Sequence, residues 1–82
     1  LDAAVPPIDG DPGARWLAGL DEALRLRAIR EWLRNSGATD LALDHVRAVE
    51  RLVVDWRGQK GVTVPGGRVV RRDGHLKFLR NH

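Results

Sequence analysis

Apolar residues recur at helical spacing in two stretches of the chain. In the first, Asp21 can cap the start of a helix, Glu22 favours its first turn, and Gly37 supplies a stop. The pattern predicts a helix over about residues 21 to 35, preceded by a short helical turn around Trp16. The apolar face of this helix consists of Leu26, Ala28, Ile29, Trp32 and Leu33.

The second helical stretch covers about residues 43 to 57 and ends before Gly58. Its apolar positions are Val46, Val49, Leu52, Val53 and Trp56. Arg51 and Asp55 stand one turn apart on its polar face, so we expect them to pair and Arg47 to stay free.

The last third of the chain alternates apolar and polar residues, as strands do. Pro65-Gly66 fits a type II turn, and Asp73-Gly74 is a strong signal for a two-residue hairpin. With these turns Arg72 faces His75, and Val69 faces Phe78. The result is a three-stranded antiparallel meander, which together with the two helices predicts an α+β domain.

Alternation assigns the side chains of this meander to two faces. The apolar face carries Val62, Val64, Val69, Leu76 and Phe78. The other face carries Thr63, Arg68, Val70, Arg72, His75, Lys77 and Leu79. We therefore expect one face to pack against the helices and the other, basic face to point outward.

Charge is unevenly distributed along the 82 residues. Residues 1 to 56 contain seven Lys or Arg and ten Asp or Glu, a net charge of −3. Residues 57 to 82 contain seven Lys or Arg and only Asp73, a net charge of +6. Such a basic end favours a phosphate-rich partner or an acidic protein surface, and the alternative is a solvated face without a partner.

Six basic residues are our candidates for nucleic-acid contact: Arg57, Lys60, Arg68, Arg72, His75 and Lys77. Side chains on the open face of a hairpin can reach successive phosphates, so we expect recognition of RNA backbone and shape. Trp32 and Trp56 lie on apolar stripes, which favours core packing over base stacking. His45, at the border of such a stripe, is either a hydrogen-bonded packing residue or an RNA contact.

Several chemical classes are excluded by composition. The chain has no cysteine and three scattered histidines, so we expect neither a disulfide framework nor a zinc site. It contains no phosphate-binding loop, and its one serine, Ser36, has no histidine near it in sequence. Catalysis by this chain and a bound cofactor are therefore not expected. No apolar run could span a membrane and no signal peptide is visible, which favours a cytoplasmic protein.

The chain resembles a known family. The stretch from Leu24 to Leu33, followed by Gly37, resembles the arginine-rich helix of actinobacterial tRNA-isoleucine lysidine synthetases. Downstream, Asp55-Trp56-Arg57-Gly58-Gln59 and Pro65-Gly66-Gly67 resemble two further motifs of that family, and the resemblance covers about residues 16 to 79. Where relatives often have a capping threonine, Ala42 stands here, so Asp40 or Thr39 would have to cap the second helix.

The resemblance implies an enzyme that uses ATP to attach lysine to the wobble cytidine of an isoleucine tRNA. That chemistry belongs to an N-terminal catalytic domain with a Ser-Gly-Gly-x-Asp-Ser loop, which this sequence lacks, so ATP and lysine would be substrates of the parent enzyme and no catalytic residue is carried over. Residues 1 to 13, with three prolines and two glycines, would be a linker from that domain. Residues 14 to 82 would form one accessory domain that binds tRNA(Ile).

Two other functions stay open from sequence. Helices followed by a basic hairpin also describe a winged-helix DNA-binding module, although aspartates beside Arg47 and Arg51 suit the major groove poorly. The second is a structural role in homodimerisation or domain docking, which self-association through apolar faces would favour.

Overall fold

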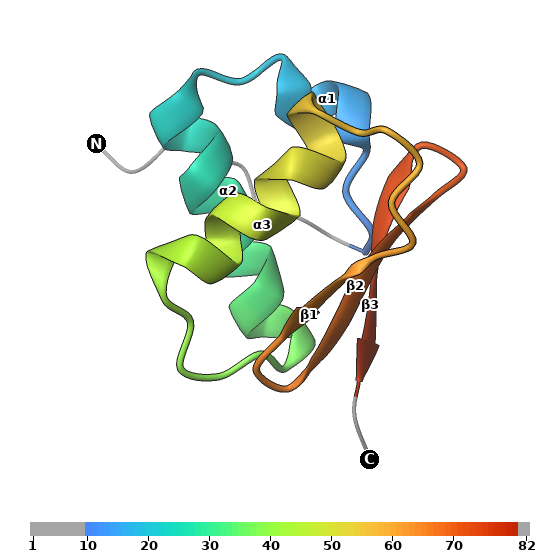
Figure 1. Cartoon of the computed structure of the whole chain (residues 1–82). Coiled ribbons are helices and arrows are strands. Elements are labelled where there is room, and N and C mark those ends of the chain that lie inside the picture. Colours follow the sequence, from blue (N-terminus) through green and yellow to red (C-terminus); the bar gives the residue numbers. More distant parts are fainter. Residues whose placement is uncertain (1–9, 81–82) are drawn as a thin grey trace.

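Three helices and three strands make up the part of the chain that the computed structural model describes, residues 10 to 80. The elements are α1 (Ala14–Ala18), α2 (Glu22–Ser36), α3 (Leu43–Val54), β1 (Val62–Val64), β2 (Gly67–Arg72) and β3 (His75–Arg80). The strands form an antiparallel sheet in the order β1-β2-β3, and the helices lie on one side of it (Figure 1). The α+β fold expected from sequence is confirmed. Of the predicted linker, residues 1 to 9 lie outside the described range.

Helix α2 begins and ends within one residue of the predicted bounds because its caps are encoded locally. The Asp21 side chain accepts a hydrogen bond from the backbone N–H of Leu24 at 3.4 Å. At the other end Gly37 has a φ of 118°, and the N–H of Ala38 donates to the Leu33 carbonyl at 2.9 Å. This left-handed turn requires a residue that tolerates positive φ, which glycine does best.

The sheet has the predicted register. Arg72 lies opposite His75, and Val69 lies opposite both Phe78 and Val62. The hairpin residues Asp73 and Gly74 have φ values of 54° and 78°, the pair of positive angles that a type I′ turn needs. The two turns that sequence analysis identified therefore set every strand pair.

The apolar face of the sheet closes onto the helices as predicted. The side chains that are fully buried come from both layers and are Leu17, Ile29, Leu33, Val49, Leu52, Val69 and Leu76. Trp32 joins this core and meets Phe78 edge to face, with ring centroids 6.4 Å apart. Val70, on the opposite face, is also buried, because Lys77 lies beside it on β3 and Gly61 approaches its methyl group on the other side.

Helix α3 ends at Val54, so the predicted end at residue 57 is wrong. Asp55 leaves the helix with φ −139° and ψ 45°. Two side chains then take hydrogen bonds that another turn would have made: Arg71 donates to the Leu52 carbonyl at 2.8 Å, and Gln59 donates to the Asp55 carbonyl at 3.2 Å. Trp56 consequently lies outside the helix and is 47% exposed, so its expected place in the core is also wrong.

The start of α3 corrects a second expectation. Ala42 is the N-cap residue, in place of Asp40 or Thr39. Alanine has no side-chain acceptor, and His45 compensates by accepting a hydrogen bond from the Ala42 N–H through Nδ1 at 3.0 Å. This is the reciprocal half of a capping box, and it gives the half-buried His45 a structural role.

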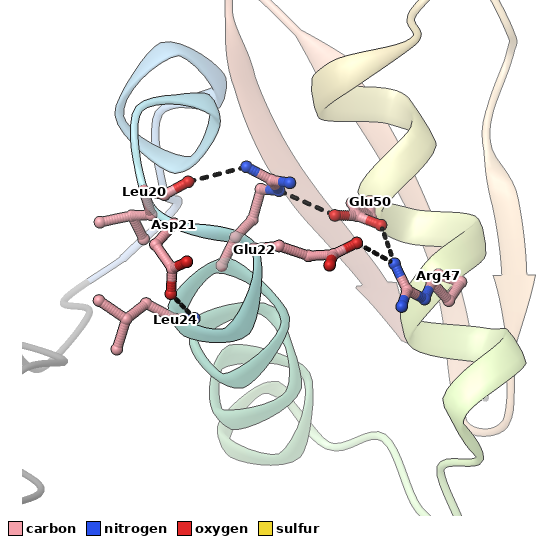
Figure 2. Close-up of polar contacts among 7 residues, drawn as sticks. Leu20, Asp21, Glu22, Leu24, Arg47 and Glu50 are labelled. Carbon is pink, nitrogen blue, oxygen red and sulfur yellow. Dashed lines mark hydrogen bonds and ion pairs between the residues drawn. The ribbon is translucent and has the colours of Figure 1, made fainter.

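A charged network joins α2 to α3 (Figure 2). Arg25 donates to Glu50 at 2.8 Å and to the Leu20 carbonyl at 2.8 Å. Arg47 donates to Glu22 at 2.7 Å and to Glu50 at 3.2 Å. The expectation that Arg47 stays free is therefore wrong. Glu50 is only 6% exposed, and a buried carboxylate is tolerated because both of its oxygens are paired.

The other ion pair expected on α3 is also different. Asp55 pairs with Arg57 at 3.1 Å between Oδ1 and Nε, and the early end of the helix explains the change of partner. The pair is well exposed, with side-chain exposure of 80% for Arg57 and 55% for Asp55, so it adds little stability.

We expect Glu50→Gln to destabilise the domain by about 2 to 4 kcal/mol, because it leaves Arg25, whose side chain is 13% exposed, without a counter-charge. Urea denaturation followed by circular dichroism measures this change. Glu31→Gln, which alters an exposed pair with Arg34, is the matched control and should leave the unfolding midpoint nearly unchanged. Equal midpoints for the two variants would contradict the assigned role of Glu50.

A pH dependence follows from Glu22. The hydrogen bond from Arg47, and then its charge, hold the pKa of the Glu22 carboxyl below its ordinary value. A carboxyl whose pKa is lowered by folding stabilises the fold above its unfolded pKa, and this contribution is lost as the pH falls through the folded pKa. Glu22→Gln should therefore destabilise the domain at pH 7, and the difference from the wild type should shrink below about pH 4.3. Urea titrations between pH 7 and pH 3 test this, and a difference that stays constant would refute it.

Candidate nucleic-acid interface

Four of the six predicted contact residues share the outer face of the sheet. Strand pairing places Arg68 opposite Leu79 and Arg72 opposite His75, and Lys77, opposite Val70, lies two pairs from each. Side chains of such alternate pairs point to the same side of the sheet. Val69 and Leu76, from the intervening pairs, are buried against the helices, so this set points away from the helical layer seen in Figure 1. Arg68, Arg72 and His75 are exposed, and Lys77 is half-buried.

The local contacts of these residues leave their charge available. Arg68 donates to the Lys60 carbonyl at 3.2 Å, and His75 Nδ1 lies 3.0 Å from the Asp73 carbonyl. Lys77 faces Asp11 at 3.5 Å, with side-chain exposures of 40% and 43%, so the pair is weak and a phosphate can compete for the lysine. Within residues 10 to 80 no acidic residue of the helices forms a salt bridge with these four.

The segment before α1 borders this face. The Pro12 carbonyl accepts a hydrogen bond from the N–H of Leu76 at 3.0 Å, and the N–H of Ala14 donates to the Gly74 carbonyl at 2.8 Å. These bonds hold Asp11 next to β3, which explains how it reaches Lys77. The end of the predicted linker thus contributes one acidic residue to the edge of the basic face.

Arg57 and Lys60 lie in the loop between α3 and β1. The Lys60 backbone lies next to the sheet, because its carbonyl accepts a hydrogen bond from Arg68. Arg57 is separate: it directly follows Trp56 in the chain and pairs with Asp55 within the loop. The structure therefore brings four of the six predicted side chains to one face, places the Lys60 backbone beside them and leaves Arg57 apart.

This loop also carries an exposed aromatic side chain, Trp56, that was not predicted from the sequence. The Arg71 guanidinium lies 4.6 Å from the ring centroid of Trp56, a cation–π contact. The helical spacing of Trp56 from Leu52 and Val53 concealed its position. The signal that could have shown it is Gln59, whose side chain closes the loop by accepting from the N–H of Arg57 at 2.6 Å.

A second cationic surface lies on the helices. It is a groove between α2 and the start of α3, lined by Leu26, Arg27, Arg30, Glu31, Arg34, Ala42, Leu43 and Val46. Leu43 is 63% exposed there, and Glu31 lies 3.8 Å from Arg34, so this surface mixes apolar, acidic and basic groups. The outer face of the sheet carries Arg68, Arg72, His75 and Lys77 beside the exposed Leu79, with Asp11 at its edge.

The described residues offer other chemistry little support. In residues 10 to 80 no cluster of three or more His, Cys, Asp or Glu could hold a metal ion. Over the same range no helix has the length and apolar character needed to cross a membrane. What the site presents is positive charge on one face of a sheet, which suits the binding of anions.

Comparison with known proteins supports the resemblance seen in the sequence. The chain is 47% identical over 81 residues to a tRNA(Ile)-lysidine synthase of Mycobacterium leprae, covering 89% of the chain and 25% of that protein. It is 46% identical over 82 residues to the tRNA(Ile)-lysidine synthase of Salinispora tropica, covering 96% of the chain and 24% of that protein. The chain thus spans about a quarter of the length of these relatives, and no solved structure matches it.

The family match covers nearly all of the described fold. Residues 15–76 match the family described as "TilS substrate binding domain", from α1 to the second residue of β3. This range includes the helices, both hairpin turns and five of the six candidate residues, all but Lys77. The chain belongs to the TilS substrate-binding domain family.

Proposed function

We propose that this chain is the accessory domain that binds tRNA(Ile) for a tRNA(Ile)-lysidine synthase, and that it does so with the outer face of its sheet. The observation that carries the proposal is the shared direction of Arg68, Arg72 and Lys77 on a face that no described helix covers. Cations in such a row neutralise successive phosphates and release counterions, which gives affinity without base specificity. Family membership supports tRNA as the nucleic acid.

The activity of the parent enzyme is part of this proposal. We expect the lysine-attaching reaction, with ATP and lysine as substrates, to take place in an N-terminal catalytic domain in the cytoplasm. The role of this chain would be to hold the tRNA while the wobble cytidine reaches that domain. The chain matches only about a quarter of the length of two tRNA(Ile)-lysidine synthases, which supports a separate catalytic region in the parent protein.

The structure weakens the winged-helix alternative. In that class a helix enters the major groove with free polar side chains. On α3, Arg47 is held by Glu22 and Glu50, and Asp44 lies in the first turn. A dimerisation role stays a second candidate because Leu43, at 63% exposure, lies on the helical groove.

We expect the double substitution of Arg68 and Arg72 by Ala to weaken binding of tRNA(Ile) and to reduce the slope of log affinity against log salt by up to about two. The slope changes because two fewer phosphates are neutralised. Filter binding or fluorescence anisotropy over a series of salt concentrations measures it.

The matched control is the double substitution of Arg30 and Arg34 by Ala, which removes the same charge from the groove on α2. It should change affinity much less. If the two doubles lowered the affinity and slope equally, net charge alone would explain binding and the sheet would have no special role. Equal affinity for tRNA and duplex DNA would support the winged-helix alternative instead.

A further inference from the structure

We propose that Trp56 is a stacking platform for one unpaired nucleotide base, with the adjoining phosphate held by Arg57 or Lys60. The inference rests on the proposed function, since it names a second kind of contact with the same RNA. The outer face of the sheet would bind the phosphate backbone, and the loop between α3 and β1 would bind a base that is not in a helix.

The first support is that the loop is built to hold its shape. The Gln59 amide bridges it, accepting from the N–H of Arg57 at 2.6 Å and donating to the Asp55 carbonyl at 3.2 Å. Asp55 also pairs with the Arg57 side chain at 3.1 Å. These bonds satisfy the loop locally, so the position of Trp56 costs little further ordering when a ligand binds.

The second support is the setting of the indole ring. Trp56 is 47% exposed, and the Arg71 guanidinium covers one face at 4.6 Å from the ring centroid. Arg71 is itself fixed, because it donates to the Leu52 carbonyl at 2.8 Å. Arg71 therefore covers one face of the ring, while about half of the Trp56 surface stays exposed. An aromatic ring oriented in this way can stack on any base, because every base has a π-face.

The third support is the positive charge around the ring, which favours RNA. The Arg71 guanidinium lies over Trp56, Arg57 follows Trp56 in the chain, and Lys60 lies in the same loop, while Asp55 pairs with Arg57. Trp and Arg also occur at protein interfaces, but Lys is depleted there, whereas single-stranded RNA sites combine an aromatic platform with both kinds of cation. The surroundings of Trp56 match the second description.

The most direct test is photocrosslinking of the 82-residue chain to a single-stranded oligouridylate, followed by trypsin and mass spectrometry. Cleavage after Arg51 and Arg57 places Trp56 in the peptide 52–57, whereas Trp16 and Trp32 fall in other peptides. We expect the uridine adduct on peptide 52–57. An adduct confined to the peptides of Trp16 or Trp32 would overturn the inference.

Substitutions provide the energetic test. Trp56→Ala should lower affinity for the single-stranded oligomer by about 10- to 100-fold, and Trp56→Phe by less than about 5-fold, because a phenyl ring still stacks. The salt slope should stay unchanged, which separates stacking from phosphate binding. Trp16→Ala is the matched control, since Trp16 is 40% exposed in α1 and, among residues 10 to 80, has no cation–π contact like that of Trp56 with Arg71. Thermal melts of each variant exclude unfolding as the cause.

Failure of this inference is distinguishable from failure of the proposed function. If Trp56→Ala binds single-stranded RNA like the wild type while the Arg68 and Arg72 double variant loses tRNA binding, the stacking role is wrong and the sheet assignment stands. If the wild-type chain binds no RNA, both are wrong. If Trp56→Ala only dissolves a dimer seen by sedimentation and leaves RNA affinity unchanged, Trp56 is a protein contact.

Discussion

The architecture depends on the burial of one face of a small sheet against a layer of helices. Val69 and Leu76 are fully enclosed there, with Leu52 of α3 in the same core. Strand geometry sends alternate side chains to opposite faces, so burying one apolar set forces its neighbours Arg68, Arg72 and Lys77 outward. A slip of one residue would bury the cations, and burying unpaired charge is far too costly. The basic surface is thus a consequence of the core.

Two sets of arginines differ in the polar contacts that they make. Three arginines donate hydrogen bonds to partners within the domain: Arg25 to Glu50, Arg47 to Glu22, and Arg71 to the Leu52 carbonyl near the end of α3. The arginines of the outer sheet face have no such carboxylate partners among the described residues. Positive charge alone therefore does not identify a contact residue in this domain; the packing around each guanidinium does.

Sequence patterns predicted the elements whose signals are local, and missed those that depend on tertiary contacts. The two ends of α2 are set by the Asp21 cap and by the positive φ of Gly37, and the strand register is set by the Asp73-Gly74 turn. Each of these signals acts on the adjacent backbone, so α2 and the register were predictable. The end of α3 was not, because side chains from Gln59 and from Arg71 on β2 replace its last turn. That shortening also explains why Trp56, which follows the helical period, is exposed. Four sheet candidates could be grouped from alternation alone, whereas the association of Lys60 with them needed the structure.

The central claim is that the outward face of β2 and β3 is the surface that meets RNA. An NMR titration of the ¹⁵N-labelled chain with tRNA(Ile) tests it most directly, because amide and guanidinium signals report contact residue by residue. The account predicts the largest changes at Arg68, Arg72, His75 and Lys77, with α2 little affected. Changes centred on Arg30 and Arg34, with the signals of β2 and β3 unmoved, would contradict it.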